Sequence, residues 1–210
     1  KELENKILET QLQLKDQELQ YLKKQIHPHF LFNTLNTIYG FALKQSKNTP
    51  DIILKLSNLL DYILYQVNKP RVSLKEEILH VKEYIDLEKI RFQDSLKVLY
   101  NFNEISAEAQ IAPMLLIPFV ENAFKHGSLI NGFLQVEIEL SLVENKLIFK
   151  IKNSFLSDDS NQISSGIGLE NIKKRLELHY NNNHDLRIEN KDNWFFVNLT
   201  ILNVNQIRNA

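Results

Sequence analysis

Hydrophobic residues near the start of the chain recur with a helical period. Between Leu8 and Ile26 they return in alternating steps of four and three, with Lys15 as the one polar member. This spacing is a heptad seam, which is typical of coiled coils. A single amphipathic helix packed on its own domain is the alternative interpretation. A parallel coiled coil leading into a dimer is favoured, because no segment before residue 26 offers this helix a partner within the chain.

The sequence predicts two further helices that form a hairpin. The helical period continues to Ala42 and ends in a polar stretch. Thr49, Pro50 and Asp51 then supply an N-cap, a first-turn proline and an acid at the positive end of a helix. The second apolar stripe runs to Val67. Because each stripe is wider than one partner helix covers, we expect two hairpins to pair as a dimeric four-helix bundle.

The period changes after residue 70. Ser73 and Glu76 form a capping-box pattern that predicts a third helix, ending near Phe92. Alternating hydrophobicity then predicts strands over 96–102, 133–142, 147–152, 186–188 and 195–202. A helical pattern predicts helices over 114–126 and 168–180. The predicted fold class is therefore α+β. A coiled coil and helical hairpin occupy residues 1–70, and a connecting helix and a two-layer sandwich with a mixed, mostly antiparallel sheet occupy residues 71–210.

Composition narrows the possible functions. Twenty-five Lys and Arg against 26 Asp and Glu give a net charge of −1, so no electrostatic argument favours a nucleic-acid partner. The absence of cysteine excludes disulfides, Cys-zinc sites and thiol catalysis, and fits a reducing compartment. The longest apolar run, Ile111 to Val120, is half the length of a membrane span of about twenty residues. Because the chain begins at Lys1 inside a charged helical pattern, we expect it to be a piece of a longer protein.

The first candidate for chemistry is the run QIHPHFLFNTLN, in which His27 and His29 flank Pro28. A proline inside an amphipathic helix costs about 3 kcal/mol, so its presence needs a reason. A kinked helix with two surface histidines is the simple interpretation. A zinc site is disfavoured, because histidines two residues apart lie on different faces of a helix.

The second and third candidates are each weak alone. In PFVENAFKHG, Asn122, Lys125 and His126 share one helix face, where an amide suits Mg²⁺ and an ammonium suits phosphate. Most such polar faces are simply solvated. In SSGIGLEN, a G-x-G opens directly into a helix and could approach a phosphate. It lacks the ending of a P-loop and the strand context of a dinucleotide-binding fingerprint.

Taken in this order, the three runs resemble those of sensor histidine kinases of the LytS/YehU type. The third run extends as GIGLENIKKRLELHY, and the resemblance covers residues 22–202. It includes the linking helix, through Tyr84, Glu88, Lys89, Arg91 and Phe92. The second half resembles the ATP-binding fold shared by gyrase, MutL and histidine kinases.

The resemblance implies that His29 is the phosphorylated histidine, whose neutral imidazole attacks the γ-phosphorus of ATP. His27 stands where the family commonly has Asn. The resemblance leaves the general base unassigned, because Phe30 follows His29 where other histidine kinases carry an acid. Asn33 lies one turn along the same face, where it could orient His29 or hold a water that removes phosphate from a partner aspartate.

The resemblance also assigns the nucleotide site. It implies that Asn122 binds Mg²⁺ and that Lys125 and His126 contact phosphates. The glycine box comprises Gly166, Ile167, Gly168 and Leu169. Residues 154–165 correspond to the lid over the nucleotide.

One departure concerns the adenine-reading box, which is Asp-x-Gly-x-Gly in most relatives. Here Asn153 is followed by Ser-Phe-Leu. The amide oxygen still accepts from the adenine amino group, but the charge is lost, so weaker ATP binding is expected.

The resemblance implies ATP and Mg²⁺ as cofactors, a homodimer, and a response-regulator receiver domain that takes the phosphoryl group on an aspartate. It implies the cytoplasmic portion of a membrane-anchored sensor, with any membrane attachment in a sensor region absent from this chain. The mobile ATP domain must meet His29, which makes 68–70 and the vicinity of Gln93 candidate hinges.

Two rival functions are weighed. An ATP hydrolase like gyrase or MutL places a Glu one turn before the metal asparagine, where this chain has Pro118. Glu121 is adjacent to Asn122 and points off that face, so hydrolysis is disfavoured. A nucleotide-gated dimeric signalling scaffold with weak or no kinase activity stays open, because the adenine box is altered.

Overall fold

The computed structural model describes residues 28–66, 69–103, 105, 108–156 and 167–205. By its internal contacts the chain divides into two units, Lys1–Leu64 and Tyr65–Ala210. The heptad seam, His27 and Gly166 lie outside the described residues. The division falls close to the predicted boundary at residue 70, and the assignment of separate domain roles stays a prediction.

The first unit contains the two predicted hairpin helices, α2 (Pro28–Leu43) and α3 (Thr49–Tyr65). Helix α3 begins at Thr49, with Pro50 and Asp51 in its first turn as predicted. The predicted N-cap role of Thr49 is wrong, because Thr49 lies inside the helix and its buried hydroxyl has no hydrogen-bond partner in the described structure. Its apolar stripe provides the buried residues Ile52, Leu56, Leu59, Tyr62 and Ile63. One chain carries one hairpin, so the pairing of two hairpins into a four-helix bundle stays a prediction.

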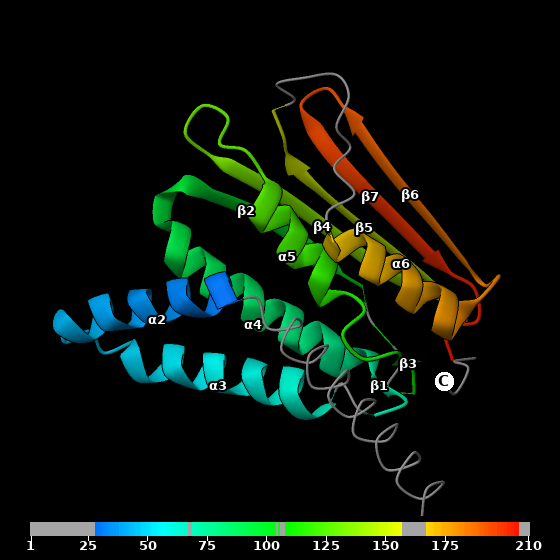
Figure 1. The fold of residues 1–210 in the computed structure, drawn as a ribbon, viewed down its shortest axis with the longest axis horizontal. Coiled ribbons are helices and arrows are strands. Elements are labelled where there is room, and N and C mark those ends of the chain that lie inside the picture. Colours follow the sequence, from blue (N-terminus) through cyan, green and yellow to red (C-terminus); the bar gives the residue numbers. More distant parts are fainter. Residues whose placement is uncertain (1–27, 67–68, 104, 106–107, 157–166, 206–210) are drawn as a thin grey trace, which may run out of the picture. The chain divides into compact units, whose positions relative to one another are not determined.

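The second unit is an α+β domain (Figure 1). Its elements are β1 (Val72–Ser73), α4 (Leu74–Phe92), the 3-10 turn η2 (Gln93–Ser95), β2 (Leu96–Phe102), β3 (Gln110–Ile111), α5 (Ile117–His126), β4 (Leu134–Val143), β5 (Lys146–Ser154), α6 (Ile167–Tyr180), β6 (His184–Lys191) and β7 (Trp194–Ile201). The predicted fold class is thereby confirmed for the described residues.

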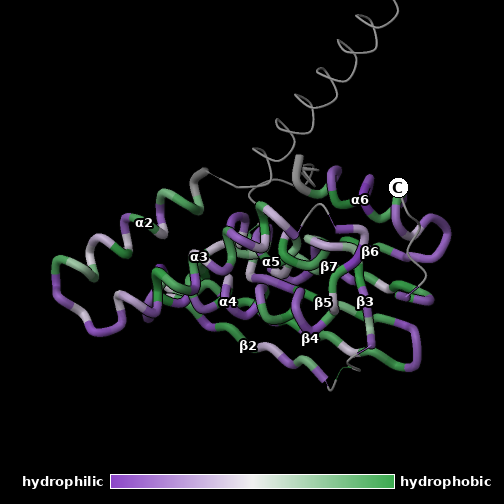
Figure 2. The backbone as a smooth tube through the Cα atoms, turned by 90° about the horizontal axis from the view of Figure 1, so that it is seen from below, coloured by the Kyte–Doolittle hydropathy of each residue, from purple (hydrophilic) through white to green (hydrophobic). Residues whose placement is uncertain are grey.

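A five-stranded sheet in the order β2-β4-β5-β7-β6 forms one layer of this domain. Strands β2 and β4 are parallel, and the other three pairings are antiparallel, as predicted for a mixed sheet. Helices α5 and α6 lie together on one face of the sheet (Figure 1). The strands alternate hydrophobic and hydrophilic residues, which is visible along the tube in Figure 2. The Phe119 and Phe149 rings, 5.9 Å apart, join α5 to the middle of the sheet.

Helix α4 starts where the capping pattern predicts. The Ser73 hydroxyl accepts a hydrogen bond from the Lys75 N–H at 3.2 Å, which satisfies one unpaired donor of the first turn. The strand prediction over residues 96–102 matches β2 at both ends. The two-residue strands β1 and β3 were not predicted, because two residues are too short to show a period.

The prediction of a helix from residue 114 is wrong at its start, because α5 begins at Ile117. Met114 has a φ of 55°, in the left-handed region, and a right-handed helix cannot pass through it. None of the helices in the part of the chain that the structure describes has both the length and the hydropathy of a membrane span.

Candidate functional site

On helix α5, the polar candidate site residues and the buried packing residues lie on different faces. Phe119, Val120, Ala123 and Phe124 are buried, and they form the side facing the domain interior. Asn122 is half-buried, whereas Lys125 and His126 are exposed at the last turn. The amide, ammonium and imidazole thus share an accessible helix face, as their spacing predicted. The arrangement supplies one hard oxygen ligand and two nitrogen groups suited to phosphate.

Two titratable groups on α5 are perturbed by their surroundings. Burial raises the pKa of the Glu121 carboxyl to about 8; the Lys125 ammonium opposes this and the Glu88 carboxylate adds to it. Although His126 is exposed as a residue, partial desolvation of its imidazole lowers the pKa, and neighbouring Lys125 lowers it further. The neutral imidazole is therefore favoured at neutral pH, and it offers one N–H donor and one acceptor.

Asn153 lies at the end of β5, beside the end of α5. Its side chain is 2% exposed, and its Nδ2 donates to the Ser154 carbonyl at 3.1 Å. The same Nδ2 would lie 3.3 Å from a Cβ built on Gly127, so the two residues are neighbours. Since Nδ2 is directed to Ser154, Oδ1 is the atom left to accept from a ligand.

Gly127 allows the end of α5 to approach the sheet. Its φ of −67° is open to any residue, so backbone conformation does not require glycine here. Space does: a Cβ would collide with Leu134 Cδ1 and would lie 2.6 Å from the Ala123 carbonyl oxygen. The Leu134 methyl is able to move, whereas the carbonyl is fixed by the last turn of α5. The glycine of the KHG run is therefore a packing residue of the site.

We predict that Gly127→Ala lowers the free energy of unfolding of the second unit by about 1 to 3 kcal/mol, because a methyl group is forced against backbone. Thermal unfolding followed by circular dichroism measures this. The matched control is Gly40→Ala in α2, where nothing lies within 4 Å of the added Cβ. Equal stability of Gly127→Ala and the wild type would contradict the close packing described.

Helix α6 begins at Ile167, directly at the predicted glycine box. Ile167 and Gly168 are its first residues, and Leu169 is buried in the domain. The first turn of a helix carries N–H groups without helical partners and the positive end of the helix dipole, which together suit phosphate. Helix α6 packs on α5, so this helix start and the polar face of α5 belong to one region of the domain.

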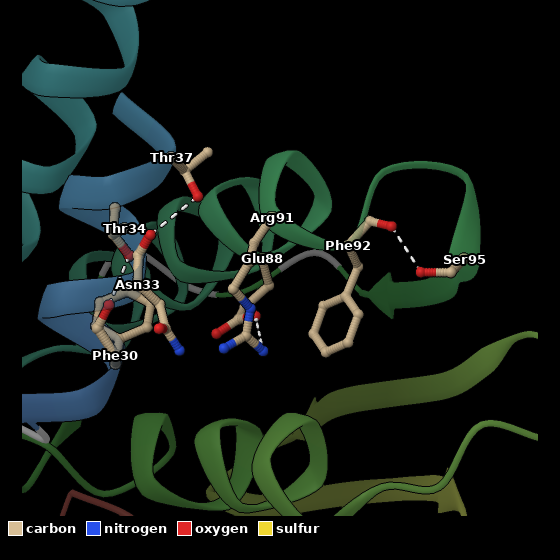
Figure 3. A network of polar contacts seen from close by, with 8 residues as sticks. All are labelled: Phe30, Asn33, Thr34, Thr37, Glu88, Arg91, Phe92 and Ser95. Atoms are coloured by element: carbon tan, nitrogen blue, oxygen red, sulfur yellow. Dashed lines mark hydrogen bonds and ion pairs between the residues drawn. The ribbon is translucent and has the colours of Figure 1, made fainter. Parts of the chain in front are cut away.

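Two of the linking-helix residues singled out by the resemblance, Tyr84 and Phe92, pack against α5. The Phe124 ring lies 5.9 Å from that of Tyr84 and 6.4 Å from that of Phe92. Glu88 Oε2 and Arg91 Nη2 form an ion pair at 2.6 Å, drawn in Figure 3. Burial raises the pKa of Glu88, while Arg91 and a hydrogen bond with Tyr84 oppose the shift. Tyr84 and Phe92 therefore form a packing contact between α4 and α5, the helix that carries Asn122.

The phosphoacceptor candidates lie in the other unit. His29 is in the first turn of α2, and Asn33 follows one helical turn later, which places them on the same helix face by spacing. Asn33 is half-buried, and its backbone carbonyl accepts from the Thr37 hydroxyl at 2.9 Å (Figure 3). The structure thus brings together Asn122, Lys125, His126, Asn153 and Leu169 in one unit, and His29 with Asn33 in the other.

Sequence reasoning missed three side chains that hold the entry to α5. Glu77 accepts hydrogen bonds from the N–H groups of Met114 and Leu116, and Arg175 donates to carbonyls of the same loop. Tyr180 reaches Ala112. Glu77 sits in the first turn of α4, where an acid is explained by the helix dipole alone, so the sequence carried no signal of its second role.

Comparison with known proteins agrees with this fold. A family model described as histidine kinase matches residues 17–96. The sensor protein kinase HptS of Staphylococcus aureus (strain USA300) is 28% identical over 205 residues, covering 91% of this chain and 39% of HptS. The chain thus spans about two fifths of the length of the curated relatives it matches.

Among solved structures, the histidine kinase domain of the Erythrobacter litoralis EL346 blue-light activated histidine kinase superposes with a TM-score of 0.52. It is 14% identical, and the match covers 91% of this chain and 93% of that domain. This likeness shows the fold of a histidine kinase domain. By the family model and the curated relatives, the chain is similar to sensor histidine kinases.

Proposed function

We propose that this chain is the kinase core of a two-component sensor that autophosphorylates His29 from Mg-ATP. The observation that carries the proposal is the polar face of α5, which holds Asn122, Lys125 and His126 and ends beside the buried amide of Asn153. Calorimetric titration with ATP, with and without Mg²⁺, tests it. Magnesium-dependent binding is expected, and no binding in either condition would contradict it.

The donor set suits Mg²⁺. Mg²⁺ is commonly bound in proteins by one or two oxygen ligands together with substrate phosphates and water, so the single amide oxygen of Asn122 suffices. The bound ion would offset negative charge on the phosphates. Lys125 supplies a cation for phosphate oxygens, and neutral His126 donates one N–H.

The chemistry proposed for His29 is nucleophilic. A neutral imidazole nitrogen forms a bond to the γ-phosphorus as the bond to the ADP oxygen breaks, and ADP leaves. Positioning and electrostatic stabilisation supply most of the rate in such transfers. We propose that the phosphoryl group then passes to an aspartate of a separate receiver domain.

We further propose that Asn33 holds a water molecule that hydrolyses the phosphorylated receiver. Asn33→Ala is expected to slow receiver dephosphorylation by about tenfold or more while His29 is still phosphorylated, because one positioned amide is lost. The measurement is the decay of purified phospho-receiver with each variant, with Asn36→Ala, an exposed amide on the same helix, as control. An unchanged decay rate with Asn33→Ala would remove this role.

Homodimerisation is proposed from an exposed apolar stripe on α2. Phe32, Leu35, Tyr39 and Leu43 are spaced by three and four residues, and three of them are more than 60% exposed. Stripes of this kind seldom remain in contact with water, because covering them gains about 25 cal/mol per Å² of apolar surface. A second hairpin presenting the same stripe would complete the predicted four-helix bundle.

We predict that the double variant Phe32→Ser with Tyr39→Ser weakens the dimer at least about tenfold, through loss of buried apolar area. Sedimentation equilibrium measures the dissociation constant. Leu99→Ser is the control, since Leu99 is 69% exposed on the edge strand β2 and outside the stripe. A double variant that dimerises like the wild type would place the interface elsewhere.

A nucleotide-gated scaffold without kinase activity is the second candidate, favoured by one observation. Asn153 stands where most relatives carry an acid, and one of its two Nδ2–H groups donates to the Ser154 carbonyl. Mg-ATP binding without phosphorylation of any histidine would support this candidate.

Membrane anchoring through an input region outside this chain is also proposed, because the matched relative is a sensor kinase of which the chain covers 39%.

A further inference from the structure

The loop of residues 112–116, which connects β3 to α5, is held by side chains from two different helices. The Met114 and Leu116 N–H groups donate to the two carboxylate oxygens of Glu77 on α4, at 3.1 and 2.8 Å. Arg175 Nη1 on α6 donates to the carbonyls of Pro113 and Met114, at 3.0 and 2.9 Å. A carboxylate and a guanidinium therefore form hydrogen bonds with the same short segment.

A third contact completes this set of hydrogen bonds, which we term the entry clamp (Glu77, Arg175 and Tyr180). The Ala112 N–H donates to the Tyr180 hydroxyl at 2.8 Å. Glu77 is 0% exposed and Tyr180 1% exposed, so water does not replace either partner in the described structure. Burial raises the pKa of the Tyr180 hydroxyl well above its usual range, and the nearby Glu77 carboxylate adds to this. The hydroxyl is therefore neutral at all working pH values.

The clamp holds a backbone that does not follow from the local sequence. Met114 adopts a φ of 55°, a conformation that costs of order 1 kcal/mol for a residue other than glycine. Such residues persist where surrounding contacts determine them, and here three charge-assisted hydrogen bonds end on Met114 or its neighbours. The clamp thereby decides where α5 starts and in which direction it leaves the loop.

The helices joined by the clamp are those that carry the proposed nucleotide site. Glu77 belongs to the linking helix α4, Arg175 and Tyr180 to α6, and the loop itself leads into α5. Asn122 lies five residues beyond the start of α5, and the glycine-box residues Ile167, Gly168 and Leu169 lie in the first turn of α6. A shift of the loop relative to either helix changes the placement of Asn122 against the α6 start.

We propose that Glu77 and Arg175 are positioning residues that set α5 and α6 in register for Mg-ATP and make nucleotide affinity depend on the position of α4. The inference rests on the proposed function, since it needs Mg-ATP to bind between these elements. Neither residue is proposed to touch the nucleotide. Displacement of α4 moves the Glu77 carboxylate and with it the N–H groups of the α5 entry, so binding and linker position are linked.

The test compares Arg175→Met and Arg175→Lys with the wild-type chain. Mg-ATP affinity is measured by calorimetry, phosphorylation rate at saturating ATP by label incorporation, and stability by thermal unfolding. Arg175→Met is expected to weaken Mg-ATP binding about tenfold or more, which lies in the range of coupling between protein sites. Arg175→Lys, which keeps one cationic donor, is expected to recover part of the loss. Arg187→Met is the control, because Arg187 is exposed and forms an ion pair with exposed Asp185.

Tyr180→Phe provides a milder variant if Arg175→Met does not fold, since it removes one hydrogen bond and keeps the ring. Weakened Mg-ATP binding by folded Tyr180→Phe is the expected result. The inference is overturned if clamp variants lower the unfolding temperature while the affinity and the saturated rate of the folded protein equal those of the wild type. Failure of the wild type itself to bind Mg-ATP would instead remove the proposed function, so the two failures are distinguishable.

Discussion

His29→Gln abolishes phosphorylation of the chain by ATP, whereas His27→Gln leaves it in place. This is the largest effect that the account predicts, because glutamine offers no imidazole nitrogen to form the phosphorus–nitrogen bond. The loss should reach the background of the assay. Incubation with γ-labelled ATP and Mg²⁺, followed by quantification of label on the protein, measures it.

His27→Gln is the matched control for this experiment. It removes the same kind of side chain two residues earlier in the sequence. Equal unfolding temperatures and equal Mg-ATP affinities of the two variants would show that the difference concerns the phosphoacceptor alone. Label that disappears in His27→Gln and survives in His29→Gln would move the acceptor to the other histidine.

Asn122→Ala is expected to weaken Mg-ATP binding at least about tenfold and to reduce phosphorylation in proportion at limiting ATP. The reason is the loss of the amide oxygen proposed as the protein ligand of Mg²⁺, in a site whose other ligands come from phosphate and water. Calorimetric titration at fixed Mg²⁺ gives the affinity. Repeating it in chelator isolates the metal-dependent part, which should be the part that the variant loses.

Asn101→Ala is the control for Asn122→Ala, since Asn101 is an exposed amide on the edge strand β2. It should bind Mg-ATP like the wild type. The role assigned to Asn122 is contradicted if Asn122→Ala keeps its full Mg²⁺-dependent affinity, or if its affinity falls by the same factor with and without the metal. The second outcome would indicate disturbed packing of α5.

Periodicity predicted most of the fold because the domain buries one face of each strand. In β4 the buried Val136, Ile138 and Leu140 alternate with less buried neighbours, and the strand is legible in the sequence for this reason. The start of α5 was misplaced because the segment before it is apolar throughout. Glu77 and Arg175 hold residues 114–116 in a non-helical conformation, and Pro118, which lacks an N–H and favours the first turn of a helix, also fits a start at Ile117.

The candidate site was likewise predictable from the sequence only in part. Spacing alone placed Asn122, Lys125 and His126 on one helix face, and the structure bears out that arrangement. The roles of these residues and of His29 came from resemblance, since polar helix faces and paired histidines are common without function. Gly127 and Glu77 were out of reach of sequence reasoning, because each acts on a segment brought close only by folding.

The proposed function depends on the transfer of a phosphoryl group from ATP to a histidine of this chain. The most direct measurement is the chemical stability of the label that the wild-type chain acquires from γ-labelled ATP and Mg²⁺. The account predicts label that survives alkali and is lost in acid, which is the behaviour of a phosphorus–nitrogen bond. Label that survives acid, or no label from a chain shown by titration to bind Mg-ATP, would contradict it.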